Sequence, residues 1–191
     1  MTYNWSMIQD ILFALWFLLP AAIANAAPIF AGKLPILSKF DAPIDASRTW
    51  RDRRILGDHK TWRGIISGIV VATFILWLQQ LLFIHYSWAQ FVSGEINYTA
   101  LPVLILGPLF AIGALGGDAI ESFFKRQRNI QSGKAWVPFD QLDYVIGSLV
   151  VSLFFVVLSP VQYLWIIAIW FLAHLLASYI GYTLGLKKDP I

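Results

Sequence analysis

Long apolar runs alternate with shorter polar stretches along this chain. A helix needs about 20 residues to cross the roughly 30 Å hydrocarbon core of a bilayer. Five apolar runs approach or exceed that length, at residues 7–27, 64–86, 100–124, 141–158 and 161–184. The fourth run is short, and only Ser159 and Pro160 lead from it into the fifth, which predicts a tight helical hairpin. The pattern predicts an all-α, polytopic membrane protein with five transmembrane helices and polar cytosolic loops.

Composition supports this class. Apolar residues make up 58% of the 191 residues and charged residues only 13%, whereas soluble domains carry roughly 25% charged residues. We expect a single integral membrane domain over residues 1–191. The chain has no cysteine, which excludes disulfides and thiolate metal sites. A formal net charge of +3 is explained better by loops that face anionic lipid than by binding to nucleic acid.

The distribution of Lys and Arg predicts the orientation. All 14 of these residues fall within residues 28–63, residues 125–140 or the C-terminal tail. Five crossings place these three segments on one side of the membrane, whereas an even number would divide them. Cytosolic loops are enriched in Lys and Arg. We therefore expect a multi-pass protein of the cell membrane whose N-terminus is outside and whose charged clusters face the cytoplasm.

A charged cluster marks the end of the third apolar run. Asp118, Ser122 and Lys125 are spaced i, i+4 and i+7, so they share one face of a helix, and Arg126 follows. Long cationic side chains at a helix end that reach lipid headgroups would explain Lys125 and Arg126. Contacts with headgroups do not explain Asp118, which lies about two turns deeper. Because a carboxylate at that depth is costly, Asp118 is a candidate functional residue.

Asp140 and Asp143 open the fourth run, with Gln141 between them. Acidic side chains at a helix start satisfy free backbone N–H groups and the helix dipole, so capping alone could explain both. Their i, i+3 spacing would also let the two carboxylates share a cation. Mg²⁺ is the cation that such a site fits, because it prefers a few protein carboxylates together with substrate phosphates.

A third charged cluster precedes the second run and contains Asp58, Lys60, Thr61 and Arg63. Its simplest role is to bind lipid headgroups at the membrane surface. Asn25 lies near the cytosolic end of the first run, where it could contact a substrate or tie helices together. All these clusters fall at cytosolic helix ends, which is where a lipid phosphate and a soluble nucleotide would meet.

Small residues at four-residue spacing predict close helix contacts. The pairs are Gly64/Gly68, Gly113/Gly117 and Gly181/Gly185. Each pair would let another helix backbone approach closely, which is how membrane helices pack.

These motifs, taken in order, resemble those of the CDP-archaeol synthase family, also called CarS-like. The resemblance covers most of the chain and rests on residues 25–28, 53–64, 117–126 and 140–143. The third stretch is also similar to bacterial phosphatidate cytidylyltransferases, whose longer His-Gly-Gly motif is absent here. This chain departs from the family where it has Ala46, Arg53 and His59 at positions that are often glycine.

The resemblance implies five transmembrane helices and a Mg²⁺-dependent cytidylyltransferase of phospholipid biosynthesis. CTP and an isoprenoid ether lipid phosphate, such as 2,3-bis-O-geranylgeranylglycerol 1-phosphate, would give CDP-archaeol and pyrophosphate. Because both substrates are anionic, metal ligands and cations are needed around them. We expect the metal ligands and catalytic carboxylates to be Asp118, Asp140 and Asp143, with Lys125 as a further catalytic residue. The expected substrate-binding residues are Asn25, Asp58, Lys60, Thr61, Arg63, Ser122, Arg126 and Gln141.

Other functions remain open at the level of sequence. A phosphatidate cytidylyltransferase-like enzyme would act on a diacyl lipid instead. A non-catalytic membrane scaffold would use its basic loops only to bind lipid, and replacing Asp118 by Asn would then be nearly silent. A small transporter would use Asp118 and His174 as a polar pathway.

Overall fold

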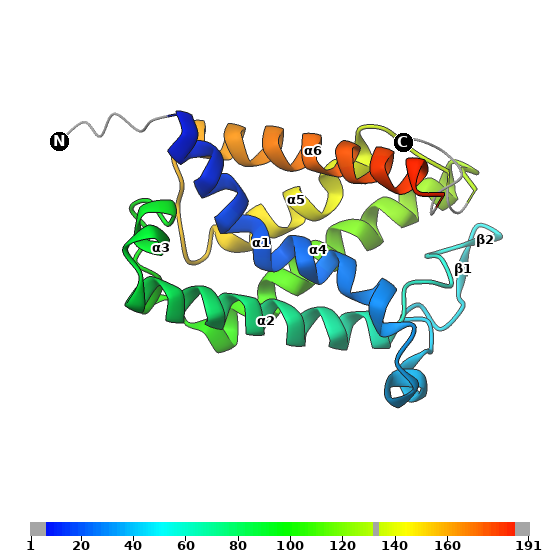
Figure 1. Cartoon of the computed structure of the whole chain (residues 1–191). Helices are drawn as coiled ribbons and strands as arrows, with labels where there is room; N and C mark the ends of the chain where they lie inside the picture. The colour runs from blue at the N-terminus through cyan, green and yellow to red at the C-terminus, as the bar shows by residue number, and fades with distance from the viewer. Residues whose placement is uncertain (1–6, 132–133, 186–191) are drawn as a thin grey trace.

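The computed structural model describes residues 7–131 and 134–185, which form a bundle of long helices (Figure 1). The helices are α1 (Met7–Ala31), α2 (Trp62–His85), α3 (Ser87–Val92), α4 (Val103–Gln127), α5 (Phe139–Ser152) and α6 (Pro160–Thr183). Between them lie the 3-10 helices η1 (Pro35–Phe40) and η2 (Tyr98–Ala100) and the two-residue strands β1 (Thr49–Trp50) and β2 (Arg53–Arg54). The prediction of a helical membrane protein is confirmed.

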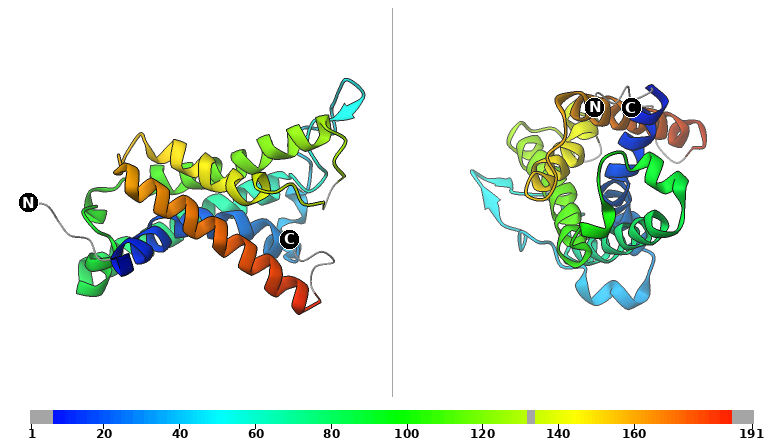
Figure 2. Two further views of the ribbon diagram at one scale, coloured as in Figure 1. Left: turned by 90° about the horizontal axis from the view of Figure 1, so that it is seen from above. Right: turned by 90° about the vertical axis from the view of Figure 1, so that its left-hand side faces the viewer.

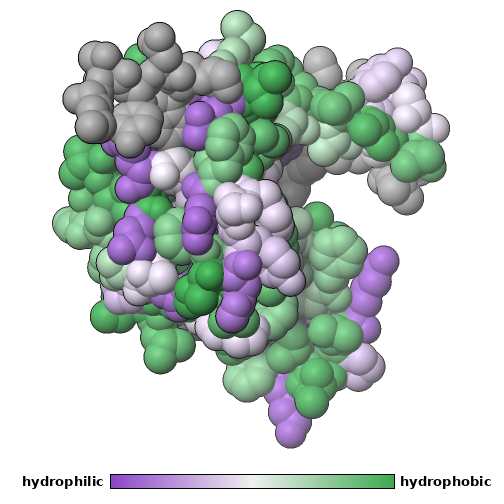
Figure 3. Space-filling view, turned by 60° about the vertical axis from the view of Figure 1, so that its left-hand side comes forward, coloured by the Kyte–Doolittle hydropathy of each residue, from purple (hydrophilic) through white to green (hydrophobic). Residues whose placement is uncertain are grey.

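Four of these helices, α1, α2, α4 and α6, are long and apolar enough to cross a bilayer. Large apolar side chains are exposed on their sides, including Leu104 and Leu164. Figure 3 shows hydrophobic residues over much of the bundle's flank, as expected for a surface that faces lipid rather than water.

The fourth predicted run is helical over only part of its length. The 14 residues of α5 rise roughly 21 Å, which is less than the roughly 30 Å of a bilayer core. Residues 153–159 then leave the helix and lead to α6, so the predicted two-residue hairpin connection is wrong. Proline forces the residue before it out of the helical region. Ser159 is accordingly extended, and it forms a capping box with Gln162 at the start of α6.

The two ends of the bundle differ in the segments they carry. Figure 1 places residues 32–61, the connection from α4 to α5 and the end of α6 at one end. The start of α1, α3 and the connection from α5 to α6 lie at the other. Every Lys and Arg among the described residues belongs to the first end, which we call the basic end. The β1–β2 hairpin and η1 project outward there (Figure 2).

Helices α4 and α5 approach closely because glycines line their contact. A Cβ atom at Gly117 would collide with the carbonyl oxygen of Asp143, and one at Gly147 would collide with that of Gly113. This confirms the close approach predicted for Gly113 and Gly117. The contact fixes the position of Asp143 relative to α4.

The other two glycine pairs differ from each other. A Cβ atom at Gly68 would lie 2.7 Å from Cδ1 of Leu115, so this glycine also permits a helix contact. Gly185 instead has a φ of +72°, and a Cβ atom there would meet no atom within 4 Å among the described residues. A glycine in this left-handed conformation commonly follows the end of a helix, and Gly185 follows α6.

Candidate functional site

Three carboxylates meet where α4 packs against α5. Asp118 and Glu121 come from α4 and Asp143 comes from α5. One carboxylate oxygen of each residue lies within 4.8 Å of those of the other two. The cluster depends on the close approach at Gly117, because that contact brings the first turns of α5 alongside the last turns of α4.

Two lysines compensate this negative charge. Lys60, in the loop that leads to α2, forms an ion pair with Asp118. The buried Lys125 has its Nζ atom 3.3 Å from Oε1 of Glu121 and 2.6 Å from Oδ1 of Asp140. The contact with Glu121 lacks hydrogen-bond geometry, so Oε1 of Glu121 has no hydrogen-bond partner among the described residues. This oxygen is therefore available to a further positive group.

Asp140 lies outside the three-carboxylate cluster. Besides its contact with Lys125, it accepts a hydrogen bond of 2.8 Å from the backbone N–H of Trp136. It therefore combines a structural role at the start of α5 with a charge that holds Lys125 in place. Gln141 is buried, and its Oε1 atom has no hydrogen-bond partner among the described residues.

A polar cavity of about 260 Å³ surrounds the cluster at the basic end of the bundle. Eight of the predicted site residues line it, namely Asn25, Lys60, Asp118, Ser122, Lys125, Arg126, Asp140 and Asp143. Four further residues complete the lining: Gly57, His59, Glu121 and His174. Residues from α1, α4, α5, α6 and the loop before α2 thus meet in one cavity that carries four carboxylates and three cations. Phosphate groups and a divalent cation fit such a lining.

The other predicted residues near the start of α2 do not line this cavity. The Asp58 side chain is 75% exposed and lies 2.5 Å from Arg54. Arg63 forms an ion pair with Asp41 at 2.9 Å. Thr61 caps α2 and lines a neighbouring, mainly apolar cavity. These residues shape the loop that carries Lys60.

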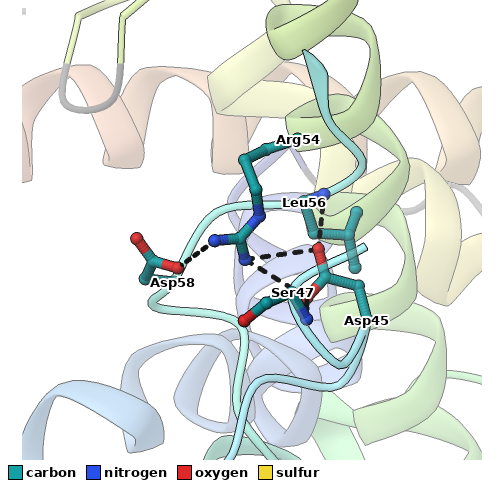
Figure 4. A network of polar contacts seen from close by, with 5 residues as sticks. All are labelled: Asp45, Ser47, Arg54, Leu56 and Asp58. Carbon is teal, nitrogen blue, oxygen red and sulfur yellow. Dashed lines mark hydrogen bonds and ion pairs between the residues drawn. The ribbon is translucent and has the colours of Figure 1, made fainter. Parts of the chain in front are cut away.

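That loop is held in shape by a buried aspartate (Figure 4). Asp45 accepts hydrogen bonds from the backbone N–H groups of Ser47 at 3.0 Å and Leu56 at 2.9 Å, and it pairs with Arg54 at 3.3 Å. Burial alone would raise the pKa of Asp45. The hydrogen bonds and the guanidinium outweigh burial and lower it below its ordinary value. Hydrogen bonding to Asp58 stabilises the charged form of Arg54 and so raises the pKa of that guanidinium.

The same loop has four residues other than glycine in a backbone conformation that favours glycine. Ala46 and Ser47 have φ values of 49° and 59°, in the left-handed region that costs energy for any residue with a side chain. Arg51 and Asp52 have φ values of 51° and 60° in the turn between β1 and β2, as a tight hairpin turn requires. Arg53 then donates a hydrogen bond to the carbonyl of Gln127 and so ties the hairpin to the end of α4.

Glu121 is the main residue that sequence reasoning did not assign to the metal. Its i+4 spacing to Lys125 agrees with the ion pair that is found between them. Its position on the same helix face as Asp118, three residues away, was the available signal. Only the packing of α5 shows that Glu121 rather than Asp140 lies beside Asp118 and Asp143.

The chain is similar to proteins of known family over nearly its whole length. Residues 7–191 match the family model described as "CarS-like: CDP-archaeol synthase". The curated CDP-archaeol synthase of Methanocaldococcus jannaschii is 38% identical over 187 residues, covering 95% of this chain and 98% of that protein. That of Thermococcus gammatolerans is 36% identical over 184 residues, covering 96% and 98%.

A solved structure agrees with these matches. It is described as an intramembrane enzyme for archaeal membrane lipid biosynthesis. Its sequence is 32% identical, the alignment covers 86% of this chain and 91% of the other, and the TM-score is 0.66. The predicted resemblance is confirmed, and the chain belongs to the CarS-like family of CDP-archaeol synthases.

Proposed function

We propose that this protein is a CTP-dependent cytidylyltransferase that converts an isoprenoid ether lipid phosphate and CTP into CDP-archaeol and pyrophosphate. The observation that carries this proposal is the polar cavity at the basic end of an otherwise apolar bundle. It combines a three-carboxylate cluster with Lys60, Lys125 and Arg126. The membership of the CDP-archaeol synthase family supplies the identity of the substrates.

The three-carboxylate cluster is our candidate for the Mg²⁺ site. Its chemistry fits, because Asp118, Glu121 and Asp143 offer hard oxygen ligands and Oε1 of Glu121 lacks a hydrogen bond among the described residues. Gathering three carboxylates at this spacing is unfavourable unless positive charge offsets it. A bound Mg²⁺ would neutralise phosphate charge as it builds up during transfer. Asp140, predicted as a third ligand, is assigned instead to positioning Lys125.

The cations of the cavity would hold the phosphates. Lys125 and Arg126 extend from the last turn of α4, and Lys60 approaches from the loop before α2. A phosphate oxygen of the lipid attacks the α-phosphorus of CTP, and the bond from that phosphorus to the bridging oxygen breaks to release pyrophosphate. The nucleophile is already an anion, so no strong general base is required. Lys60 and Lys125 would stabilise the charge on the phosphoryl oxygens.

Five crossings of the membrane are also part of this proposal. Helix α5 and residues 153–159, which begin with a turn, lead together from the basic end of the bundle to the opposite end (Figure 1). This path would complete a crossing that α5 alone is too short to make. The N-terminus would then lie outside, and the polar cavity would open to the cytoplasm, from which CTP arrives.

The proposal is tested by incubating the purified protein in detergent with radiolabelled CTP, Mg²⁺ and a panel of lipid phosphates. We expect a CDP-lipid from the geranylgeranyl ether phosphate, with a higher kcat/KM than from diacyl phosphatidate. An equal or higher value for phosphatidate would favour the diacyl enzyme. No CDP-lipid from any lipid phosphate would contradict a cytidylyltransferase.

A further inference from the structure

Helix α4 contains one glycine that helix packing does not explain. A Cβ atom at Gly107, Gly113 or Gly117 would collide with a neighbouring segment. At Gly116 it would meet no atom within 4 Å among the described residues. Glycine destabilises a helix interior relative to alanine. Neither helix propensity nor helix packing therefore explains Gly116, and the space beside it is open to a ligand.

Two apolar cavities meet at this position, one on each side of α4. The first, of about 300 Å³, lies against α1 and α2 and is lined by Ile29, Ile65 and Leu115 among others. The second, of about 670 Å³, lies between α4 and α5. Ile112 and Gly116 line both cavities, so they form the ridge that separates them. Ile112 is 50% exposed, which places this ridge at the lipid-facing surface of the bundle.

Both cavities also reach the charged cluster. Lys60 and Asp118 line the first cavity, and Glu121 and Asp143 line the second. A phosphate held at the cluster would therefore have an apolar cavity within reach on either side of α4. A lipid whose single phosphate carries two apolar chains matches this arrangement of one charged point and two diverging apolar spaces.

We propose that the lipid phosphate straddles α4 at Gly116, with one chain in the α1/α2/α4 cavity and the other in the α4/α5 cavity. This inference rests on the proposed function and adds the mode of lipid binding to it. Gly116 is then a specificity-determining residue, because a side chain there would fill the space where the two chains diverge. A lipid with a single chain needs only one of the cavities and would depend less on Gly116.

The kinetic test compares Gly116→Leu with Ala177→Leu, which places the same leucine side chain at an exposed position of α6 that lines neither cavity. We expect Gly116→Leu to lower kcat/KM for the two-chain ether lipid phosphate about tenfold or more, and to lower it for a monoalkyl glycerol phosphate much less. The KM for CTP should not change. Equal kinetics of the two variants on the two-chain lipid, or an equal loss on both lipids, would overturn the proposal.

A second measurement uses the unaltered protein, so it does not depend on how the variants fold. A two-chain ether lipid phosphate with a diazirine in one chain, and its isomer with the diazirine in the other, are photolysed on the protein. We expect adducts on α5 from one isomer and on α1 or α2 from the other. Adducts of both isomers on the same side of α4 would overturn the straddling mode. If the same protein still made the CDP-lipid, the proposed function would stand.

Discussion

Lys125 holds the charged residues of the cavity together. Its ammonium group lies between Glu121, which belongs to the same helix α4, and Asp140, which belongs to α5. Asp140 is further fixed by the N–H of Trp136, so Lys125 has a well-defined position. This arrangement separates two kinds of carboxylate: those grouped with Asp118, and Asp140, which orients the lysine.

Replacing Glu121 by Gln removes a charge from the proposed Mg²⁺ site. It should lower activity by about two orders of magnitude, a loss of about 2.7 kcal/mol, and shift the Mg²⁺ dependence to higher concentrations. Asp140→Asn is the matched control, because it should lower turnover while leaving the Mg²⁺ midpoint nearly unchanged. The measurement is initial rate against Mg²⁺ concentration. A larger midpoint shift for Asp140→Asn would return Asp140 to the metal site.

The lowered pKa of Asp45 determines how we expect the loop before α2 to respond to acid. Its folded pKa is lowered, so its contribution to stability is complete above the ordinary aspartate value of 3.8 and is lost as the pH falls through the lower, folded value. The hydrogen-exchange protection factors of residues 41–61 should therefore fall only below that ordinary value. In Asp45→Asn the loop should exchange fast at neutral pH already. An acid response that is the same in both proteins would exclude Asp45 as its cause.

At the level of residues, the sequence predicted most of the residues that line the cavity. Asp118, Ser122 and Lys125 follow helical periodicity, which is a local property, and all three line the cavity. Whether a carboxylate faces a lysine or another carboxylate depends on how two helices are placed against each other. That placement is set by Gly117 against the backbone of Asp143, so the position of Glu121 beside Asp118 and Asp143 could not be deduced from the sequence.

Among the elements, α5 is the one whose length hydropathy predicted wrongly. The run 141–158 is mainly apolar beyond Asp143, yet the helix ends at Ser152. Hydropathy reports whether a segment suits lipid, and it does not distinguish helix from extended chain. The residues that follow Ser152 include Phe154 to Val157, which are aromatic or β-branched and so are weaker helix formers. The extended Ser159 before Pro160 then sets the start of α6.

The contact between α4 and α5 gives a stability prediction. Gly117→Ala would force a methyl group against the carbonyl of Asp143 and should destabilise the protein by about 1–3 kcal/mol. Gly116→Ala adds the same methyl group in open space on the same helix and should be neutral or stabilising by up to about 1 kcal/mol. Thermal denaturation of both variants in the same detergent measures the difference. Equal melting temperatures would mean that the glycine contact does not support the bundle.

For the whole molecule, the basic end and the cavity lie together. The loop before α2, the last turns of α4 and the first turns of α5 supply its charged residues, and they come from distant parts of the sequence. The charge distribution along the sequence predicted that these segments share one side of the membrane. The fold agrees, since Figure 1 places all three at one end of the bundle.

The crossing that includes α5 can be tested directly, because the chain has no cysteine. Single cysteines at the exposed positions Asn129, Glu95 and Val157 would mark the basic end, the opposite end and the connection from α5 to α6. In oriented vesicles, we expect Glu95→Cys and Val157→Cys to label from the same side and Asn129→Cys from the other. Labelling of Val157→Cys from the side of Asn129→Cys would mean that α5 returns without crossing.

The most direct test of the account follows the phosphorus of CTP. The protein is incubated with Mg²⁺, a geranylgeranyl ether lipid phosphate and CTP that carries the label either at the α- or at the γ-phosphate, and the lipid is extracted. Attack at the α-phosphorus predicts that only the α-label enters the lipid and that the γ-label leaves as pyrophosphate. Label from the γ-phosphate in the lipid, or no label from either nucleotide, would contradict a cytidylyl transfer at this site.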